Sequence, residues 1–186
     1  MPKISSYEVV APVSSDLVLI TDVSDSNNTR SATVGSLGVT VYSGYYTEIF
    51  NQTSTVTTIT GINTFVKISG TTTTGLTNNA NLVTTSNRIT NQTGASMTFI
   101  ATYSISANTG TNNQNLMFRL VINGNATSVT KSEADIVTSS NTKVSSTSNT
   151  ALITLANGEY VELWVANATA ITNVTVEHFN LVLRQI

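Results

Sequence analysis

The chain has 186 residues, enough for one full domain with a sizeable core and a short appendage, but not for two large domains. Only 10% of the residues are charged and the formal net charge is −2, with Lys and Arg scattered singly, so we expect no nucleic-acid partner. The sequence has no long apolar run and no cysteine, so we expect no membrane span, signal peptide, disulfide or thiolate chemistry. These features predict a protein made and assembled in a cytoplasm.

The composition favours β-structure along most of the chain. About two-fifths of the residues are Ser, Thr or Asn, and 40% are hydrophobic. Thr is β-branched and stiff at χ1, which suits a pleated strand better than a helix, while Asn and Ser suit turns and edges. Stability must therefore come from apolar burial and backbone pairing in an all-β fold.

Residues 1–40 read differently from the rest, because only short apolar pieces occur between polar stretches. The clearest piece, residues 16–20, predicts one short strand that has to dock on another surface to bury its apolar row. Gly35 and Gly38 then mark a linker. We expect an N-terminal arm at 1–40 and a separate domain at 41–186.

From about Tyr45 onward, short β-branched and aromatic segments alternate with Asn, Gly and Ser clusters, which is typical of a sandwich or barrel. The Asn123-Gly124 and Asn157-Gly158 pairs predict turns, with a new strand near Thr127. The Ser- and Thr-rich stretch 137–150 fits either a loop or an edge strand, and we favour a loop with some pairing. The expected strands are 56–62, 64–68, 82–89, 96–106, 116–122, 150–155, 160–165 and 174–186.

Side chains for catalysis are few in this sequence. His178 is the sole histidine, the ten acidic residues are dispersed, and no nucleophile, phosphate-loop or metal motif is present. We expect a protein without enzymatic activity, cofactor or metal. Tyr42, Tyr45 and Tyr46 suggest either a carbohydrate platform or packing where the linker meets the domain, and we favour packing.

Several segments together resemble the jelly-roll domain of the tumour necrosis factor and complement globular-head superfamily. The resemblance covers about residues 45–186, and it implies an antiparallel jelly-roll sandwich that forms a homotrimer, with one sheet of each subunit around a threefold axis. The segments that carry it are 88–91, 98–106, 120–124, 155–164 and 179–183, which read RITN, TFIATYSIS, LVING, LANGEYVELW and FNLVL.

A second resemblance concerns the N-terminal arm. Residues 11–22, APVSSDLVLITD, and 29–37, TRSATVGSL, resemble N-terminal segments of many phage virion proteins. Such segments have an Asp-Leu-Val-x-Ile strand, a short polar hairpin and a Thr-x-x-x-Leu close. This resemblance implies a phage particle rather than an animal ligand.

Two strands carry the expected trimer contacts, because both of their faces are apolar or amphipathic. In 160–165, alternate residues suit the core and the others carry large amphipathic side chains. In 174–186, Phe179, Leu181 and Leu183 form one face, and the opposite face is also apolar enough to be covered. The expected trimer-interface residues are Tyr160, Glu162, Trp164, Val176, His178 and Val182, with Trp164 as the leading anchor.

These features predict a structural protein on the outer surface of a virion, most simply a trimeric capsid decoration or cement protein. Its arm would dock on the major capsid protein through Leu17, Leu19 and Ile20. One alternative is a short tail fibre or receptor-binding knob, in which the arm binds a tail protein and loops such as 108–115 contact the host surface. A second alternative is a carbohydrate-binding module for a host surface glycan.

Overall fold

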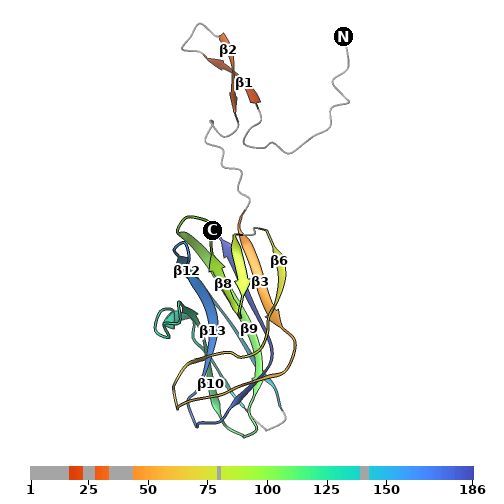
Figure 1. Ribbon diagram of the computed structural model, residues 1–186, viewed down its shortest axis with the longest axis vertical. Helices are drawn as coiled ribbons and strands as arrows, with labels where there is room; N and C mark the ends of the chain where they lie inside the picture. Colours follow the sequence, from red (N-terminus) through yellow and green to blue (C-terminus); the bar gives the residue numbers. More distant parts are fainter. Residues whose placement is uncertain (1–16, 23–27, 34–43, 79–80, 139–142) are drawn as a thin grey trace. The chain divides into compact units, whose positions relative to one another are not determined.

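In the computed structural model, the chain divides into two compact units, Met1–Ser43 and Gly44–Ile186 (Figure 1). The first unit contains an antiparallel hairpin of β1 (Leu17–Asp22) and β2 (Asn28–Thr33). The predicted linker glycines lie outside the described residues, as does Tyr42. The structure describes residues 17–22, 28–33, 44–78, 81–138 and 143–186.

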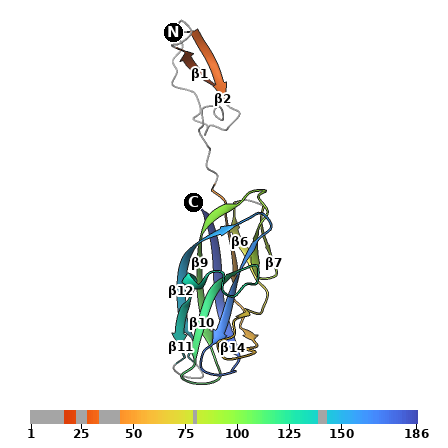
Figure 2. The same ribbon diagram turned by 90° about the vertical axis from the view of Figure 1, so that its left-hand side faces the viewer.

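The second unit is an antiparallel jelly-roll sandwich of two six-stranded sheets, as the sequence predicted (Figures 1 and 2). One sheet has the order β11-β10-β13-β8-β7, with β5 paired to β13; the other has the order β12-β9-β14-β3-β6, with β4 paired to β14. The strands of the first sheet are β5 (Val66–Lys67), β7 (Leu82–Thr85), β8 (Arg88–Asn91), β10 (Asn115–Ile122), β11 (Ala134–Val137) and β13 (Tyr160–Asn167). Those of the second are β3 (Tyr46–Asn51), β4 (Thr55–Thr57), β6 (Thr73–Thr77), β9 (Met97–Asn108), β12 (Ser145–Leu155) and β14 (Val174–Gln185).

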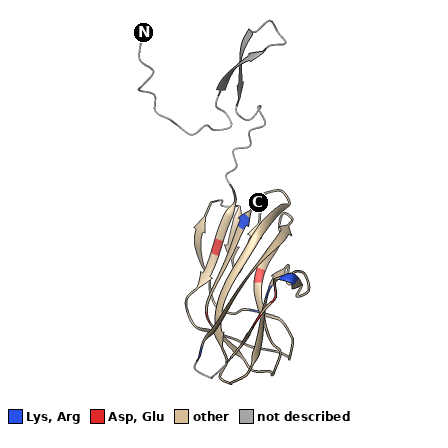
Figure 3. Ribbon diagram, turned by 180° about the vertical axis from the view of Figure 1, so that it is seen from behind, with Lys and Arg blue, Asp and Glu red and all other residues tan. Residues whose placement is uncertain are grey.

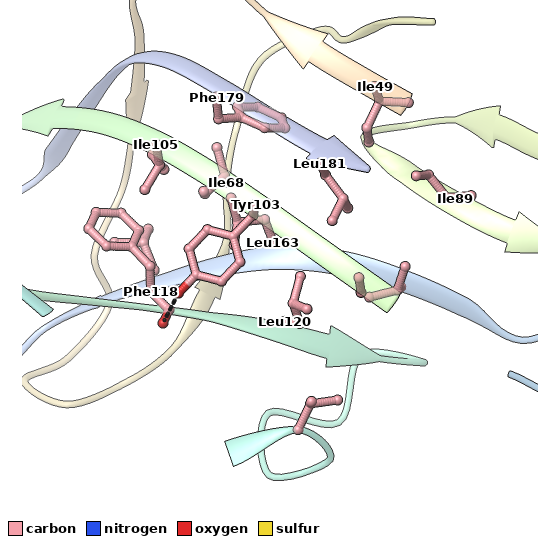
Figure 4. Close-up of a cluster of buried hydrophobic side chains, with 14 of the residues drawn as sticks. Ile49, Ile68, Ile89, Tyr103, Ile105, Phe118, Leu120, Leu163, Phe179 and Leu181 are labelled. Atoms are coloured by element: carbon pink, nitrogen blue, oxygen red, sulfur yellow. Dashed lines mark hydrogen bonds between the residues drawn. The ribbon is translucent and has the colours of Figure 1, made fainter. Parts of the chain in front are cut away.

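Strict alternation in β9 explains why this segment forms one long continuous strand. Phe99, Ala101, Tyr103, Ile105 and Ala107 are buried, and the residues between them are half-buried or exposed. A strand with this period places one row in the core and the other on the outside of its sheet. The buried row packs against the inner sides of β10, β13 and β14 in one contiguous core (Figure 4).

Tyr103 links the two sheets through its hydroxyl group. The hydroxyl donates to the carbonyl oxygen of Phe118 in β10, at 3.0 Å (Figure 4). It also donates to the carbonyl oxygen of Ser132, at 2.8 Å. Burial raises the pKa of the Tyr103 phenol far above its usual range, and the nearby carboxylates of Glu133 and Asp135 raise it further. The phenol therefore stays neutral and acts as a donor inside the core.

Several strand predictions need correction. Residues 82–89 are not one strand: Ser86 and Asn87, at φ 52° and 57°, form the turn of the β7–β8 hairpin. Asn123-Gly124 is a turn, but no strand starts near Thr127, because the chain passes through a short 3-10 helix, η2 (Thr130–Ser132), before β11.

A further correction concerns 137–150, for which the sequence favours a loop with some pairing over an edge strand. Val137 ends β11, and from Ser145 the chain is already in β12, paired with β9 from Ser145 opposite Ala107 onward. Residues 139–142 lie outside the described part of the chain. The sequence does not predict the first part of this strand, because polar residues occupy both of its sides as far as Thr150.

Other differences concern strands near the start of the sandwich. The predicted strands 56–62 and 64–68 are strand only at Thr55–Thr57 and Val66–Lys67. Two strands, β3 and β6, were not predicted. The sequence of β3 does show the alternation of a strand, since Thr47 and Ile49 are buried and Tyr46, Glu48 and Phe50 between them are not.

The sandwich has two distinct ends. Gly44, where the N-terminal unit joins, lies close to the C-terminus, because the Gln185 backbone N–H donates to the Tyr45 carbonyl at 2.8 Å. We call this the arm end. The opposite end, the tip, carries the loops 109–114 and 168–173, since Asn108 ends β9 opposite Thr175 near the start of β14.

Candidate functional site

The six expected trimer-interface residues do not form one surface. Tyr160, Glu162 and Trp164 lie on the outward side of β13 in one sheet, whereas His178 and Val182 lie on the outward side of β14 in the other. The two sheets pack against each other through their inner faces, so the two groups of residues face away from each other. The two outer faces of the sandwich therefore have to be judged separately.

The outer side of β10 and β13 is largely covered by the chain itself, and we call it the closed face. Its centre is Arg119, whose guanidinium lies 3.8 Å from the centre of the Phe65 ring. The same guanidinium donates to the Ala126 carbonyl at 2.7 Å and pairs with the Glu133 carboxylate. Two segments, 59–67 and 123–133, thus meet over this residue.

Burial on the closed face confirms that its own loops cover it. Val121 and Ala166 are both 0% exposed, yet neither belongs to the core cluster between the sheets. Val121 lies opposite Glu162 in the β10–β13 ladder, on the outward side. An outward-facing Val that is fully buried needs a covering layer, and here the chain provides it.

The predicted contacts on this face are already satisfied within one chain. Glu162 is 4% exposed, and its carboxylate accepts hydrogen bonds from Lys67 Nζ at 2.5 Å and from Trp164 Nε1 at 2.9 Å. The Arg88 guanidinium lies 4.3 Å from the centre of the Tyr160 ring. Glu162 has its partners inside the chain, and Trp164 is half-buried with its donor occupied. These residues stabilise the closed face.

The outer side of β3, β9, β12 and β14 carries no such covering layer in the described chain, and we call it the bare face. Hydroxyl groups of β9 and β12 pair across the strands along this face: Thr98 with Thr154 at 3.2 Å, Thr102 with Thr150 at 3.0 Å, and Ser106 with Ser146 at 2.8 Å. Such cross-strand hydroxyl pairs favour this register of the two strands, and each stabilises the sheet by about 0.2–1 kcal/mol.

An apolar centre interrupts these polar rows toward the arm end. Ile100 lies opposite Leu152, which is 52% exposed, and Val182 lies opposite Thr102 on the other side of β9. Formal charge is sparse, because the four strands contain only Glu48, Glu177 and Arg184, and the whole sandwich carries few charged residues (Figure 3). A weakly charged face with an apolar centre is the composition of a subunit contact.

Val176 was expected beside His178 and Val182, and this expectation is wrong. The β9–β14 register shifts between Val176 and His178, which marks a β-bulge. The bulge puts Val176 on the inward side with Phe179, and Val176 is 0% exposed in the core. It contributes to the core of one chain and has no surface to offer a second one.

The expected docking residues of the arm lie in one element. Leu17, Leu19 and Ile20 are all in β1, which pairs with β2, with Ile20 opposite Arg30. A two-stranded hairpin is marginally stable alone in water, so a partner surface that covers it would add to its stability.

Within the described ranges, no group of three His, Asp or Glu side chains is close enough to hold a metal ion, and no helix is long and apolar enough to cross a membrane. Glu159, an acid in the β12–β13 turn, accepts from the Ala156 backbone N–H and from Asn123 Nδ2, so it fixes the turn. No protein-family model matches the chain, and no curated protein matches it.

Proposed function

We propose that the chain is a structural protein of a bacteriophage virion, which forms a homotrimer through its bare face and attaches to the particle through its N-terminal unit. The observation that carries this proposal is the difference between the two outer faces: the closed face is covered by the chain's own loops, and the bare face is left for another subunit. Its most specific form is a capsid decoration or cement protein at the outer surface, bound to the major capsid protein.

The jelly-roll strand order supports the trimer. Jelly rolls of the tumour necrosis factor and complement globular-head superfamily, which residues 45–186 resemble, form compact trimers with one sheet of each subunit around the threefold axis. The sheet that contains β14 is suited to this position, since its outer face presents Ile100, Leu152 and Val182 among neutral hydroxyl groups. Burying such a face costs little desolvation of charge.

The arm supports attachment to a particle. The hairpin unit is compact by itself and joins the sandwich at Gly44, at the end opposite the tip loops. An arm that docks at this end leaves the tip free. A free tip also supports the second candidate, a tail fibre or receptor-binding knob whose tip, including loop 109–114, contacts the host surface.

Copy number in the particle tests the proposal and separates the two candidates. Quantitative mass spectrometry of purified particles of the encoding phage measures the ratio of this chain to the major capsid protein. Hundreds of copies per particle support the decoration protein, and a handful to a few tens support the tail appendage. Absence of the chain from washed particles contradicts both.

A further inference from the structure

The bare face contains a hollow on the tip side of its apolar centre. Its volume is about 350 Å³, at the lower end of the range for pockets that hold small molecules. Strands β3, β14, β9 and β12 all contribute to it, and the residues that matter here are Glu48, Phe50, Gln52, Ser104, His178 and Asn180.

The register gives the position of this hollow relative to the apolar centre. His178 lies opposite Ser106 and Asn180 opposite Ser104, whereas Ile100 lies opposite Arg184, near the end of β14. The rows of Ser104 and Ser106 are four and six residues further along β9 than Ile100, at a rise of roughly 3.3 Å per residue. The hollow therefore begins beside Val182, which lies opposite the lining residue Glu48, and extends away from Ile100 toward the tip.

The polar groups of the hollow are free to bind a ligand. Within the described chain, the side chains of Ser104, His178 and Asn180 have no hydrogen-bond partner, and Ser104 and His178 are exposed. Glu48 uses one carboxylate oxygen for the Leu76 backbone N–H, at 3.4 Å, which leaves its second oxygen available. Amide, imidazole, hydroxyl and carboxylate groups thus converge around the half-buried ring of Phe50.

We propose that this hollow binds one ring of a neutral saccharide. Sugar hydroxyl groups both donate and accept, so they match the free amide of Asn180, the imidazole of His178 and the carboxylate of Glu48. The apolar C–H face of a pyranose ring fits against an aromatic ring such as Phe50. No Lys or Arg lines the hollow and one carboxylate does, which disfavours phosphates and other anions.

Saturation-transfer NMR on the full chain tests this assignment, with a panel of neutral sugars as the probe: glucose, galactose, mannose, N-acetylglucosamine, rhamnose and their short oligomers. We expect transfer to the ring protons of at least one sugar, and a loss of at least tenfold in affinity on Phe50→Ala or Asn180→Ala. Thr154→Ala, on the same face at the arm end, is the matched control and leaves binding unchanged.

Three outcomes overturn the inference. They are no transfer to any sugar of the panel, binding that survives both hollow variants, and binding that Thr154→Ala removes equally. The molecular mass of each variant, measured by sedimentation in the same buffer, keeps this test separate from the trimer. A trimer that binds no sugar contradicts the saccharide site and leaves the assembly proposal intact, because a second copy then covers the hollow.

Discussion

The closed face and the bare face belong to the same sandwich, and their strands show similar outward alternation, yet they differ in what covers them. On the closed face, the Arg119 guanidinium contacts Phe65, Ala126 and Glu133 from two segments, and the outward-facing Val121 is fully buried. On the bare face, Leu152 is 52% exposed and hydroxyl groups pair only with one another. One face therefore serves the stability of the single chain, and the other is available for assembly.

Replacing an outward-facing Val on each face by Lys gives the largest expected effect. Val121→Lys places an ammonium group in a fully buried site opposite Glu162, whose two oxygens already accept from Lys67 and Trp164, and is expected to cost more than about 3 kcal/mol of unfolding free energy or to prevent folding. Val182→Lys on the bare face is expected to cost less than about 0.5 kcal/mol in the monomer. Urea unfolding at nanomolar concentration, followed by the fluorescence of Trp164, measures both. Equal losses contradict the distinction between the faces.

Neutralising the buried carboxylate of the closed face gives a smaller loss. Glu162→Gln keeps an acceptor for Trp164 Nε1 but removes the charge that Lys67 Nζ meets at 2.5 Å. We expect about 1–3 kcal/mol, toward the lower end because the Lys67 side chain is 31% exposed and regains water. Glu48→Gln on the bare face is the control, with an expected change below about 0.5 kcal/mol. A larger loss of unfolding free energy for Glu48→Gln than for Glu162→Gln would contradict the difference between the two faces.

Tyr103→Phe tests the link between the two sheets. Removing the hydroxyl leaves the Phe118 and Ser132 carbonyl oxygens without this donor, so we expect a loss of about 1 kcal/mol. The raised pKa of Tyr103 adds a pH effect. Unfolded Tyr ionises near pH 10 and the folded phenol does not, so wild-type stability is complete below pH 10 and falls as the pH rises above it. In the Tyr103→Phe variant, the unfolding free energy should fall less steeply with pH above 10. An unchanged pH dependence would contradict the assignment of this loss to Tyr103.

The hydroxyl pairs of the bare face give the smallest effect. Thr150→Val removes the 3.0 Å contact with Thr102 and keeps the β-branched shape. We expect a loss of a few tenths of a kcal/mol in the monomer, measured by urea unfolding at nanomolar concentration. A loss above about 1.5 kcal/mol would mean that these hydroxyl groups stabilise the single chain, and the bare face would then resemble the closed one.

Period-two patterning predicted the sandwich and the inward rows correctly, as in β9 and β13. It did not distinguish the two faces, because alternation shows that Trp164 points outward but not whether the chain covers it. The covering depends on contacts such as Phe65 with Arg119, which are far apart in the sequence and carry no local signal. For this reason the sequence predicts a subunit contact at Trp164 and Glu162, although the chain itself covers this face.

Local irregularities account for the other differences. The bulge at Val176 shifts the inward and outward rows of β14 by one residue, which no alternation rule can detect. The start of β12 was hidden because Ser and Thr occupy both of its sides. The hollow of the bare face combines residues from four strands, and of these the sequence singled out only His178, as a trimer contact.

The mass of the full chain in solution tests the central claim most directly, that the bare face is a subunit contact. Sedimentation equilibrium at micromolar concentration should give three times the chain mass of 19.7 kDa, and Val182→Lys should reduce it to a single chain mass. Ile171→Lys, a substitution of an exposed Ile at the tip, should remain trimeric as the control. A wild-type protein that sediments as a monomer, or a Val182→Lys variant that stays trimeric, contradicts the account.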